Sequence, residues 1–261
     1  MPYRLAAIDL DGTLIASDGK VSDANARALQ HLASRGVVVA AATARPYFAA
    51  MRPFEAANVG AAAIACAGAD VRLQGGTVVE QAAMPHDFAA FIAGLCDRAG
   101  WPATLTTRER TYRRENEMPA WAGSRTDIVA TTRLADAGLD GVLAVLANVP
   151  LGAAFLDELE AWEGRVSMHR ATLFNGESLL TITAQGVDKG YGLRALCGAM
   201  GVPPGEAVAF GDSDVDAPMF EVAGMAVAMG SAPGQVKAAA GMVAPTADES
   251  GFAAAVHRLW P

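Results

Sequence analysis

Residues 3–13 have the sequence YRLAAIDLDGT, in which an apolar run ends at two aspartates. The run from Leu5 to Ile8 has no alternation of polar and apolar side chains, which is typical of a strand buried on both faces. Asp9 and Asp11 follow the end of that strand directly. Because open α/β sheets bind ligands at the carboxyl ends of their strands, the segment predicts a parallel sheet with a polar site at this edge.

Further apolar runs follow at intervals that leave room for helices. A helix that begins after Ser22 and ends near Gly36 separates the first strand from a second apolar run at residues 37–42. This order of strand, helix and strand predicts a parallel sheet. The same pattern recurs in four more apolar runs, at residues 61–67, 207–210, 225–228 and 242–244. We therefore predict an α/β fold with a Rossmann-like parallel-sheet core.

The character of the sequence changes between residues 84 and 185. Phe88, Ile92 and Leu95 mark an amphipathic helix, and short alternating segments with much of the chain's arginine follow it. From Lys189 the rhythm of strands and helices resumes. The sequence thus predicts a core formed by residues 1–83 and 186–261, with an inserted α+β cap domain at residues 84–185.

Composition narrows the class of protein. The chain has 261 residues, and 52% of them are hydrophobic, which is enough for a sizeable core. Its formal net charge of −8 argues against nucleic-acid binding, which needs a basic surface. No uncharged stretch is long enough to cross a bilayer, and Asp9 and Asp11 interrupt the N-terminal apolar run, so we expect neither a membrane span nor a signal peptide. An odd number of cysteines (Cys66, Cys96 and Cys197) predicts free, reduced thiols in a cytoplasmic protein.

Four polar clusters lie at the ends of predicted core strands: Asp9 to Thr13, Thr43, Lys189, and Asp212 to Asp216. Each one alone has a structural explanation, such as a turn or a solvated helix start. Together they predict a site, because closely spaced carboxylates repel one another unless a cation compensates them. Three carboxylates suit Mg²⁺, which keeps water ligands that a phosphate substrate can replace.

The same clusters contain the groups that phosphoryl transfer needs. A carboxylate fixed at a strand end, such as Asp9, can attack phosphorus and form an aspartyl-phosphate. Asp11 can protonate the leaving alcohol and then deprotonate the water that hydrolyses the intermediate. Gly12 allows close backbone approach to a phosphate, and Thr43 and Lys189 can stabilise the oxygens that gather charge.

The chain resembles the haloacid dehalogenase (HAD) superfamily, in its Cof-like, type IIB branch of phosphatases with an α/β cap. The resemblance covers nearly the whole chain and rests on four motifs, at residues 9–13, 42–46, 186–190 and 211–219. It implies Mg²⁺-dependent hydrolysis of a small phosphorylated metabolite, a sugar phosphate or similar compound, that the cap selects.

The resemblance also implies a role for each motif residue. Asp9, Asp11, Thr43 and Lys189 are the implied catalytic residues. Phosphate or substrate contacts fall on Gly12, Ala44, Arg45 and Lys189. The implied metal ligands are Asp9, the carbonyl of Asp11, and Asp212, with Asp216 behind them.

Several residues depart from the motifs. Val215, Ala67 and Ser231 stand where asparagine is usual, and Ala44 replaces a glycine. We expect Asp214 or Asp216 to compensate in part for Val215. Because of these departures, the sequence is also compatible with a relative of these phosphatases that binds phosphate but does not turn it over.

Two more functions are compatible with these residues. A phosphomutase or phosphotransferase would use the same aspartyl-phosphate, and a receiver-like signalling module would also phosphorylate an aspartate. Asp11 favours ester hydrolysis over dehalogenation, because an alkoxide leaving group needs a proton and a halide does not. Four cap arginines (Arg108, Arg110, Arg113 and Arg114) could form a solvated face or bind an anion. The physiological substrate and the choice between monomer and homodimer do not follow from the sequence.

Overall fold

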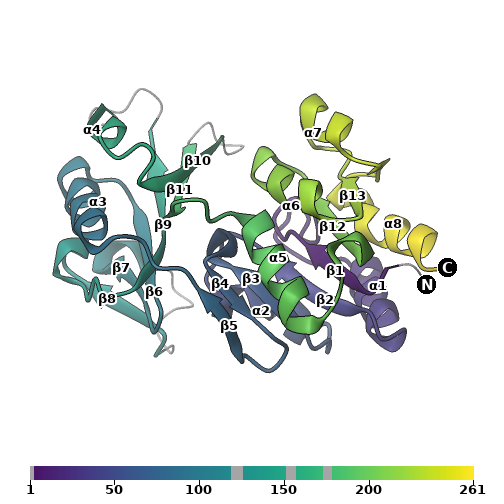
Figure 1. The fold of residues 1–261 in the computed structure, drawn as a ribbon. Coiled ribbons are helices and arrows are strands. Elements are labelled where there is room, and N and C mark those ends of the chain that lie inside the picture. The colour runs from purple at the N-terminus through teal and green to yellow at the C-terminus, as the bar shows by residue number, and fades with distance from the viewer. Residues whose placement is uncertain (1–2, 119–125, 151–156, 173–177) are drawn as a thin grey trace. The chain divides into compact units, whose positions relative to one another are not determined.

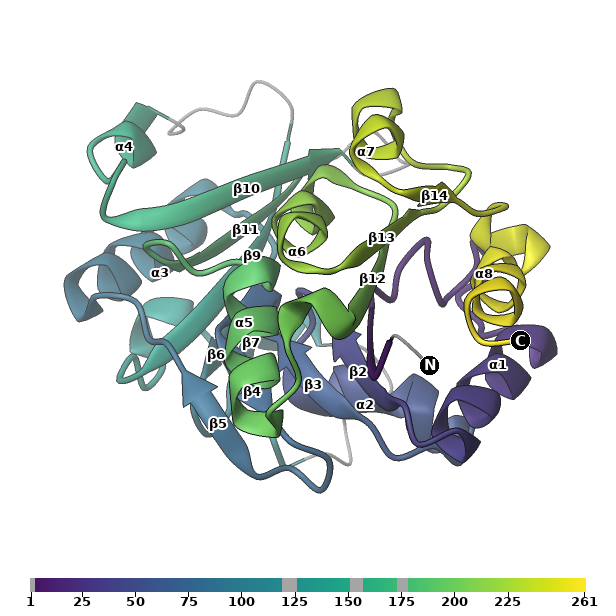
Figure 2. The same ribbon diagram turned by 45° about the vertical axis from the view of Figure 1, so that its right-hand side comes forward.

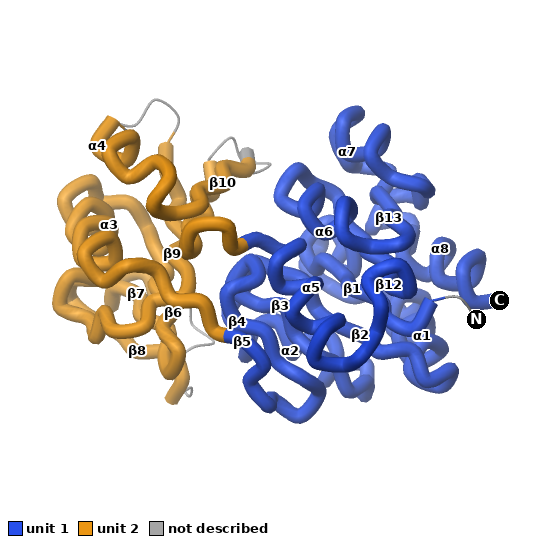
Figure 3. The backbone as a smooth tube through the Cα atoms, in the orientation of Figure 1, with its two compact units in different colours: residues 1–80, 188–261 blue, residues 81–187 orange. Residues whose placement is uncertain are grey.

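The computed structural model describes residues 3–118, 126–150, 157–172 and 178–261. The chain divides into two compact units, which Figure 3 colours separately. Unit 1 comprises Met1–Glu80 and Asp188–Pro261, and unit 2 comprises Gln81–Val187. The sequence-based boundaries, at 83/84 and 185/186, lie within the two short connections between the units.

Unit 1 contains an eight-stranded sheet in the order β14-β13-β12-β1-β2-β3-β4-β5. The strands from β14 to β3 are parallel, and β4 is antiparallel to β3. The α/β fold with a parallel core sheet is therefore confirmed. The strands are β1 (Leu5–Ile8), β2 (Val38–Ala42), β3 (Ala62–Ala65), β4 (Asp70–Arg72), β5 (Val78–Gln81), β12 (Ala207–Gly211), β13 (Met225–Ala228) and β14 (Met242–Val243).

Helices cover both faces of this sheet, so its central strands are buried on both sides (Figures 1 and 2). In β1 the side chains of Ala6 and Ile8 pack into one core, and those of Leu5 and Ala7 into the other. Such two-sided burial explains why the β1 sequence is uniformly apolar. One face carries α1 (Asp23–Ser34), α2 (Tyr47–Ala56) and α8 (Gly251–Leu259), and the other carries α5 (Lys189–Met200), α6 (Ala217–Val222) and α7 (Gly234–Ala239).

Unit 2 contains a separate six-stranded sheet in the order β10-β11-β9-β6-β7-β8. It is mixed, because β7 and β8 are parallel and the other neighbours are antiparallel. One of its faces packs against α3 (His86–Ala99), and α4 (Asp157–Glu160) lies in the same unit. The strands are β6 (Ala103–Thr107), β7 (Thr111–Arg114), β8 (Ile128–Thr131), β9 (Val142–Val149), β10 (Val166–Thr172) and β11 (Ser178–Ala184).

Two expectations from composition can be compared with the structure. All three cysteines are buried and none of them forms a disulfide, as predicted. Among the described residues, no helix combines the length and the apolar character that a membrane crossing requires.

Candidate active site

The buried centre of the site is an ion triad at the carboxyl ends of β1 and β12. Lys189 begins α5, and its Nζ donates to Asp9 Oδ1 and to Asp216 Oδ1, each at 2.6 Å. All three residues are at most 6% exposed. Since a buried charge without a partner is costly, Lys189 and the two carboxylates stabilise one another in this position.

Asp216 organises the loop after β12. Its Oδ2 accepts hydrogen bonds from the backbone N–H groups of Asp212 and Ser213 and from the Ser213 hydroxyl, each at 3.0 Å. Because both of its oxygens already have partners, Asp216 positions Lys189 and the Asp212 loop. Ser213 has no role in the sequence-based interpretation, although a serine three residues before an acidic residue is a capping-box signal.

The carboxylates differ from exposed ones in their pKa. Burial raises the pKa of Asp9 well above its usual range, although Lys189 opposes the shift. Burial and the neighbouring Asp216 raise the pKa of Asp212 to about 7. Burial disfavours the charge on Lys189, but Asp216 and Asp9 outweigh it and raise the lysine pKa. The site therefore has an excess of negative charge that favours binding of a cation.

Gly12 brings the Asp212 carboxylate close to the loop after β1. Its φ is +84°, and a Cβ at this position would lie 2.2 Å from Asp212 Oδ2. Only glycine fits both the backbone conformation and the close approach. The contact is with Asp212, whereas the sequence interpretation gives Gly12 a contact with substrate phosphate.

Asp11 and Arg45 form a second cluster beside the triad. Arg45 Nε donates to Asp11 Oδ2 at 2.9 Å, and Arg45 Nη2 bonds the other carboxylate oxygen. This two-point pairing engages the Asp11 carboxylate with Arg45. Thr43 is buried at the end of β2 and Ala44 is half-buried beside it. The Thr43 hydroxyl accepts from Arg45 N–H at 3.2 Å, and among the described contacts no hydrogen bond joins it to the triad.

A turn after β3 connects Thr43 with the start of α5. Cys66, Ala67 and Gly68 all have positive φ values, of 51°, 53° and 103°. Ala67 N–H donates to Thr43 O at 2.9 Å. A Cβ at Gly68 would lie 2.0 Å from Asp188 O, next to Lys189. The turn thus contacts two predicted site segments, although none of its three residues has a catalytic or binding role in the sequence-based interpretation.

The acidic residues can form a cation site. Asp9, Asp212 and Asp216 each offer a carboxylate oxygen, and these oxygens lie within 4.8 Å of one another. An all-oxygen donor set suits a hard divalent cation such as Mg²⁺. Of the two residues that we expected to compensate in part for Val215, Asp214 is exposed and accepts from Gln235 at 2.7 Å, whereas Asp216 is buried and bonds Lys189.

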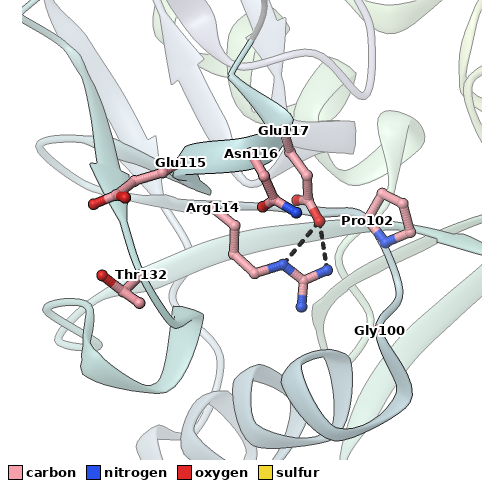
Figure 4. Close-up of a pocket in the computed structure, with 7 residues that line it drawn as sticks. All are labelled: Gly100, Pro102, Arg114, Glu115, Asn116, Glu117 and Thr132. Carbon is pink, nitrogen blue, oxygen red and sulfur yellow. Dashed lines mark hydrogen bonds and ion pairs between the residues drawn. The ribbon is translucent and has the colours of Figure 1, made fainter.

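The cap arginines do not behave as one group. Arg114 is held internally: its guanidinium pairs with Glu117 and donates to the Trp101 and Cys96 carbonyl oxygens. Figure 4 shows Arg114 and Glu117 pointing toward each other at the side of a hollow in unit 2. Arg114 therefore belongs neither to a solvated surface nor to a site for a substrate anion, the two alternatives that the sequence left open. Arg108 and Arg110 are exposed, and Arg113 is half-buried.

Known proteins match this chain over nearly its whole length, in sequence and in fold. The chain matches the haloacid dehalogenase-like hydrolase family over residues 6–256. It is 28% identical to the phosphatase YwpJ of Bacillus subtilis (strain 168), over 98% of this chain and 99% of that protein. It is 27% identical to the 5-amino-6-(5-phospho-D-ribitylamino)uracil phosphatase YitU of the same organism, over 97% and 95% of the two chains. Its fold matches the subclass IIB sugar phosphatase BT4131 with a TM-score of 0.79, at 21% identity and 98% coverage of each chain.

The comparisons and the fold define a class of enzyme, the hydrolases of phosphoric monoesters that combine a parallel core sheet with a separate mixed cap sheet. The chain belongs to the haloacid dehalogenase-like hydrolase family.

Proposed function

We propose that the protein is a Mg²⁺-dependent phosphatase that hydrolyses a small phosphorylated metabolite, a sugar phosphate or similar compound, through an aspartyl-phosphate on Asp9. The observation that carries the proposal is the buried triad, in which Lys189 Nζ lies 2.6 Å from both Asp9 Oδ1 and Asp216 Oδ1. The phosphatases YwpJ and YitU support this reaction, and YitU, a 5-amino-6-(5-phospho-D-ribitylamino)uracil phosphatase, supports a small phosphorylated metabolite as substrate.

Asp9 is the nucleophile in this proposal. Lys189 occupies only Oδ1 in the described contacts, which leaves Oδ2 to attack phosphorus. The lysine also fixes the carboxylate in one orientation, so little reorganisation precedes the attack. Attack forms the Asp9 O–P bond as the P–O bond to the leaving alcohol breaks. Water then attacks the phosphorus, which releases inorganic phosphate and regenerates the Asp9 carboxylate.

Asp11 is the proposed acid and base. In its protonated form it gives a proton to the leaving oxygen, and as a carboxylate it later takes one from the attacking water. Arg45 bonds both oxygens of this carboxylate, so the pairing must open before Asp11 can contact the leaving oxygen. We place Arg45 with Asp11 rather than directly on the substrate, and we keep Thr43, Gly12 and Ala44 as proposed phosphate-side residues.

The residues present fit a divalent cation. The Asp9 and Asp212 carboxylates would hold it, with the Asp11 carbonyl as the third proposed ligand, while Asp216 fixes the loop behind them. When bound, Mg²⁺ would neutralise phosphate charge and the excess negative charge of the carboxylates.

Initial rates of p-nitrophenyl phosphate hydrolysis test the proposal. The wild type should hydrolyse the ester with Mg²⁺ and not with excess chelator, and Asp9→Asn should lower kcat by about 10³-fold or more. The matched control is Asp214→Asn, which changes an exposed aspartate of the loop that also contains Asp212. This variant should leave the rate within about twofold of the wild type. If Asp9→Asn keeps Mg²⁺-dependent turnover, the mechanism is wrong. If the folded wild type binds Mg²⁺ but hydrolyses no phosphomonoester across a broad panel, the protein is a binding-only relative.

A further inference from the structure

The loop that follows β1 carries Asp11 and is closed by its own backbone contacts. Gly12 N–H donates to Ile15 O at 3.0 Å. One β-bridge joins Asp11 to Ile15, and a second joins Ile15 to Val21. We call residues 10–22 the acid-base loop. Because Ile15 takes part in all three contacts, its position determines the position of the Asp11 backbone.

The Asp11 side chain depends on this backbone more than Asp9 does. It is 62% exposed, and in the described part of the chain its carboxylate hydrogen bonds are those with Arg45. Asp9, in contrast, is buried, its N–H donates to Phe210 O at 3.0 Å, and its carboxylate bonds Lys189. A displacement of the acid-base loop should therefore move Asp11 and leave Asp9 in place.

A segment near the other end of the chain holds the acid-base loop from outside. Asp248 uses both carboxylate oxygens: Oδ1 accepts from Ser17 N–H at 2.8 Å and Oδ2 accepts from the Ser17 hydroxyl at 3.1 Å. The Ser22 and Ser250 hydroxyls bond each other at 2.8 Å. These contacts join residues that are 231 and 228 positions apart. We call residues 246–253 the anchoring segment.

Asn25 connects the same two parts of the chain from inside. It lies on α1, which packs beside α8 (Figure 2), and it is fully buried. Its Nδ2 donates to Leu14 O, and its Oδ1 accepts from Ala253 N–H, each at 3.1 Å. Since an unsatisfied buried polar group is costly, the Asn25 amide fixes the residue before Ile15 relative to α8.

We propose that Asp248 and Asn25 are positioning residues for Asp11. They hold the acid-base loop against the anchoring segment and keep the Asp11 carboxyl group where it can protonate the leaving oxygen. The proposal rests on the phosphatase function proposed above and extends it to a segment outside the four sequence motifs. Position matters because a general acid acts only within hydrogen-bond distance, and a small displacement lowers the rate.

Two aryl esters with different leaving groups test the proposal in the full-length enzyme at saturating Mg²⁺. Phenyl phosphate releases a more basic oxygen than p-nitrophenyl phosphate, so its reaction depends more on proton donation by Asp11. The ratio of kcat/KM for the two esters is independent of the amount of folded enzyme. We expect Asp248→Ala to lower kcat/KM about tenfold for phenyl phosphate and less than about threefold for p-nitrophenyl phosphate. Asp11→Asn should alter the ratio in the same direction and by more.

Three further variants assign the effect to the hydrogen bonds. Asp248→Asn keeps an oxygen for Ser17 N–H and an amide that can donate to the Ser17 hydroxyl, so its ratio should lie within about twofold of the wild type. Asn25→Asp keeps the acceptor for α8 but places an oxygen against Leu14 O, so it should alter the ratio as Asp248→Ala does. Glu55→Ala is the control, because it removes an exposed carboxylate from α2 and should leave both rates unchanged.

The outcomes separate this inference from the phosphatase proposal. An unchanged ratio in Asp248→Ala, or equal losses for the two esters, overturns the inference while the phosphatase proposal stands. Hydrolysis of neither ester by the wild type overturns both. Circular dichroism checks folding, which the exposure of Asp248 favours. If Asp248→Ala does not fold, Ser17→Ala, which removes one of the two bonds, should alter the ratio in the same direction, and an unchanged ratio there overturns the inference.

Discussion

At the scale of the residue, the site depends on Lys189 compensating two buried carboxylates. Asp9 and Asp216 both bond its Nζ, and none of the three side chains is more than 9% exposed. Removal of one partner from a buried ion cluster leaves uncompensated charge in a medium that solvates it poorly. Lys189 is therefore required for stability as well as for the proposed chemistry.

We expect Lys189→Met to lower the free energy of unfolding by about 3–5 kcal/mol, the usual cost of breaking a buried ion pair. Urea denaturation measures the change. Lys20→Met is the control, because Lys20 is 80% exposed and its loss should cost less than about 0.5 kcal/mol. Equal stability of Lys189→Met and the wild type would contradict the view that the triad is a stabilising unit.

Backbone strain at Ala67 leads to a second residue-scale prediction. Ala67 has φ 53° and ψ 32°, in the left-handed region that costs a residue with a Cβ about 1–2 kcal/mol. Ala67→Gly should raise the free energy of unfolding by about 0.5–1 kcal/mol, because glycine removes this cost and loses part of the gain to chain entropy. Ala69→Gly, in the right-handed helical conformation of the same turn, should instead destabilise the protein. If both variants change the free energy of unfolding in the same direction, the backbone at Ala67 is not strained.

Much of this detail has no signature in the sequence. The aspartates that follow β1 and β12 and Thr43 are predictable because strand ends in a parallel sheet meet at one edge. The sequence predicts Lys189 at the end of a core strand, but it begins α5 and follows no strand of that sheet. The Arg45–Asp11 pair is not predictable, since side-chain direction in a loop depends on tertiary packing. The left-handed conformation of Ala67 is not predictable for a related reason: alanine does not favour it, and the hydrogen bond that accompanies it, from Ala67 N–H to Thr43 O, joins residues far apart in sequence.

At the scale of the element, α5 carries Lys189 and must lie very close to β3 and its turn. Gly192 permits this, because a Cβ there would lie 2.4 Å from Ile64 Cγ2. Gly190 permits a similar approach to α6, because a Cβ there would lie 2.3 Å from Pro218 O. Two glycines in the first turn weaken a helix by their entropy. Their presence there is explained by packing, which places the Lys189 ammonium between two carboxylates.

Two substitutions in α5 separate packing from helix propensity. Gly192→Ala should destabilise the protein by about 1–3 kcal/mol, because the added methyl group overpacks the contact with Ile64. Gly198→Ala is the matched control on the same helix, where the new Cβ meets nothing within 4 Å. It should stabilise the protein by up to about 1 kcal/mol through helix propensity. Thermal unfolding of both variants measures the difference, and destabilisation by Gly198→Ala would contradict the interpretation.

At the scale of the whole molecule, the sequence predicts the architecture better than the site. Apolar runs without alternation identify the core strands, because burial on both faces leaves no polar positions. The face of the cap sheet that lies against α3 is likewise visible as period-two alternation. The direction of β8 cannot be predicted from this alternation, because its parallel pairing with β7 depends on tertiary structure.

Folding stability should depend on pH through the acidic cluster. Asp212 has a pKa raised to about 7 by burial, so between its ordinary value of 3.8 and that value the folded protein binds more protons than the unfolded chain. The free energy of unfolding must then fall as pH rises through this interval. With excess chelator, the melting temperature of the wild type should therefore decrease as the pH is raised from about 5 to about 8. The decrease should be smaller in the Asp212→Asn variant.

Mg²⁺ should reverse that loss, because a bound cation replaces the proton among the carboxylates. The ion should raise the melting temperature more at about pH 8 than at about pH 5, where protons compete for the same oxygens. Parallel pH curves for the wild type and Asp212→Asn, with and without Mg²⁺, would contradict this assignment of the cluster.

The stereochemical course at phosphorus tests the central claim most directly. A phosphorothioate monoester made chiral by oxygen isotopes is hydrolysed by the wild type, and the configuration of the thiophosphate is determined by NMR. Transfer to Asp9 and then to water comprises two in-line displacements, so the account predicts retention of configuration. Inversion would show a single displacement by water and would contradict an aspartyl-phosphate intermediate.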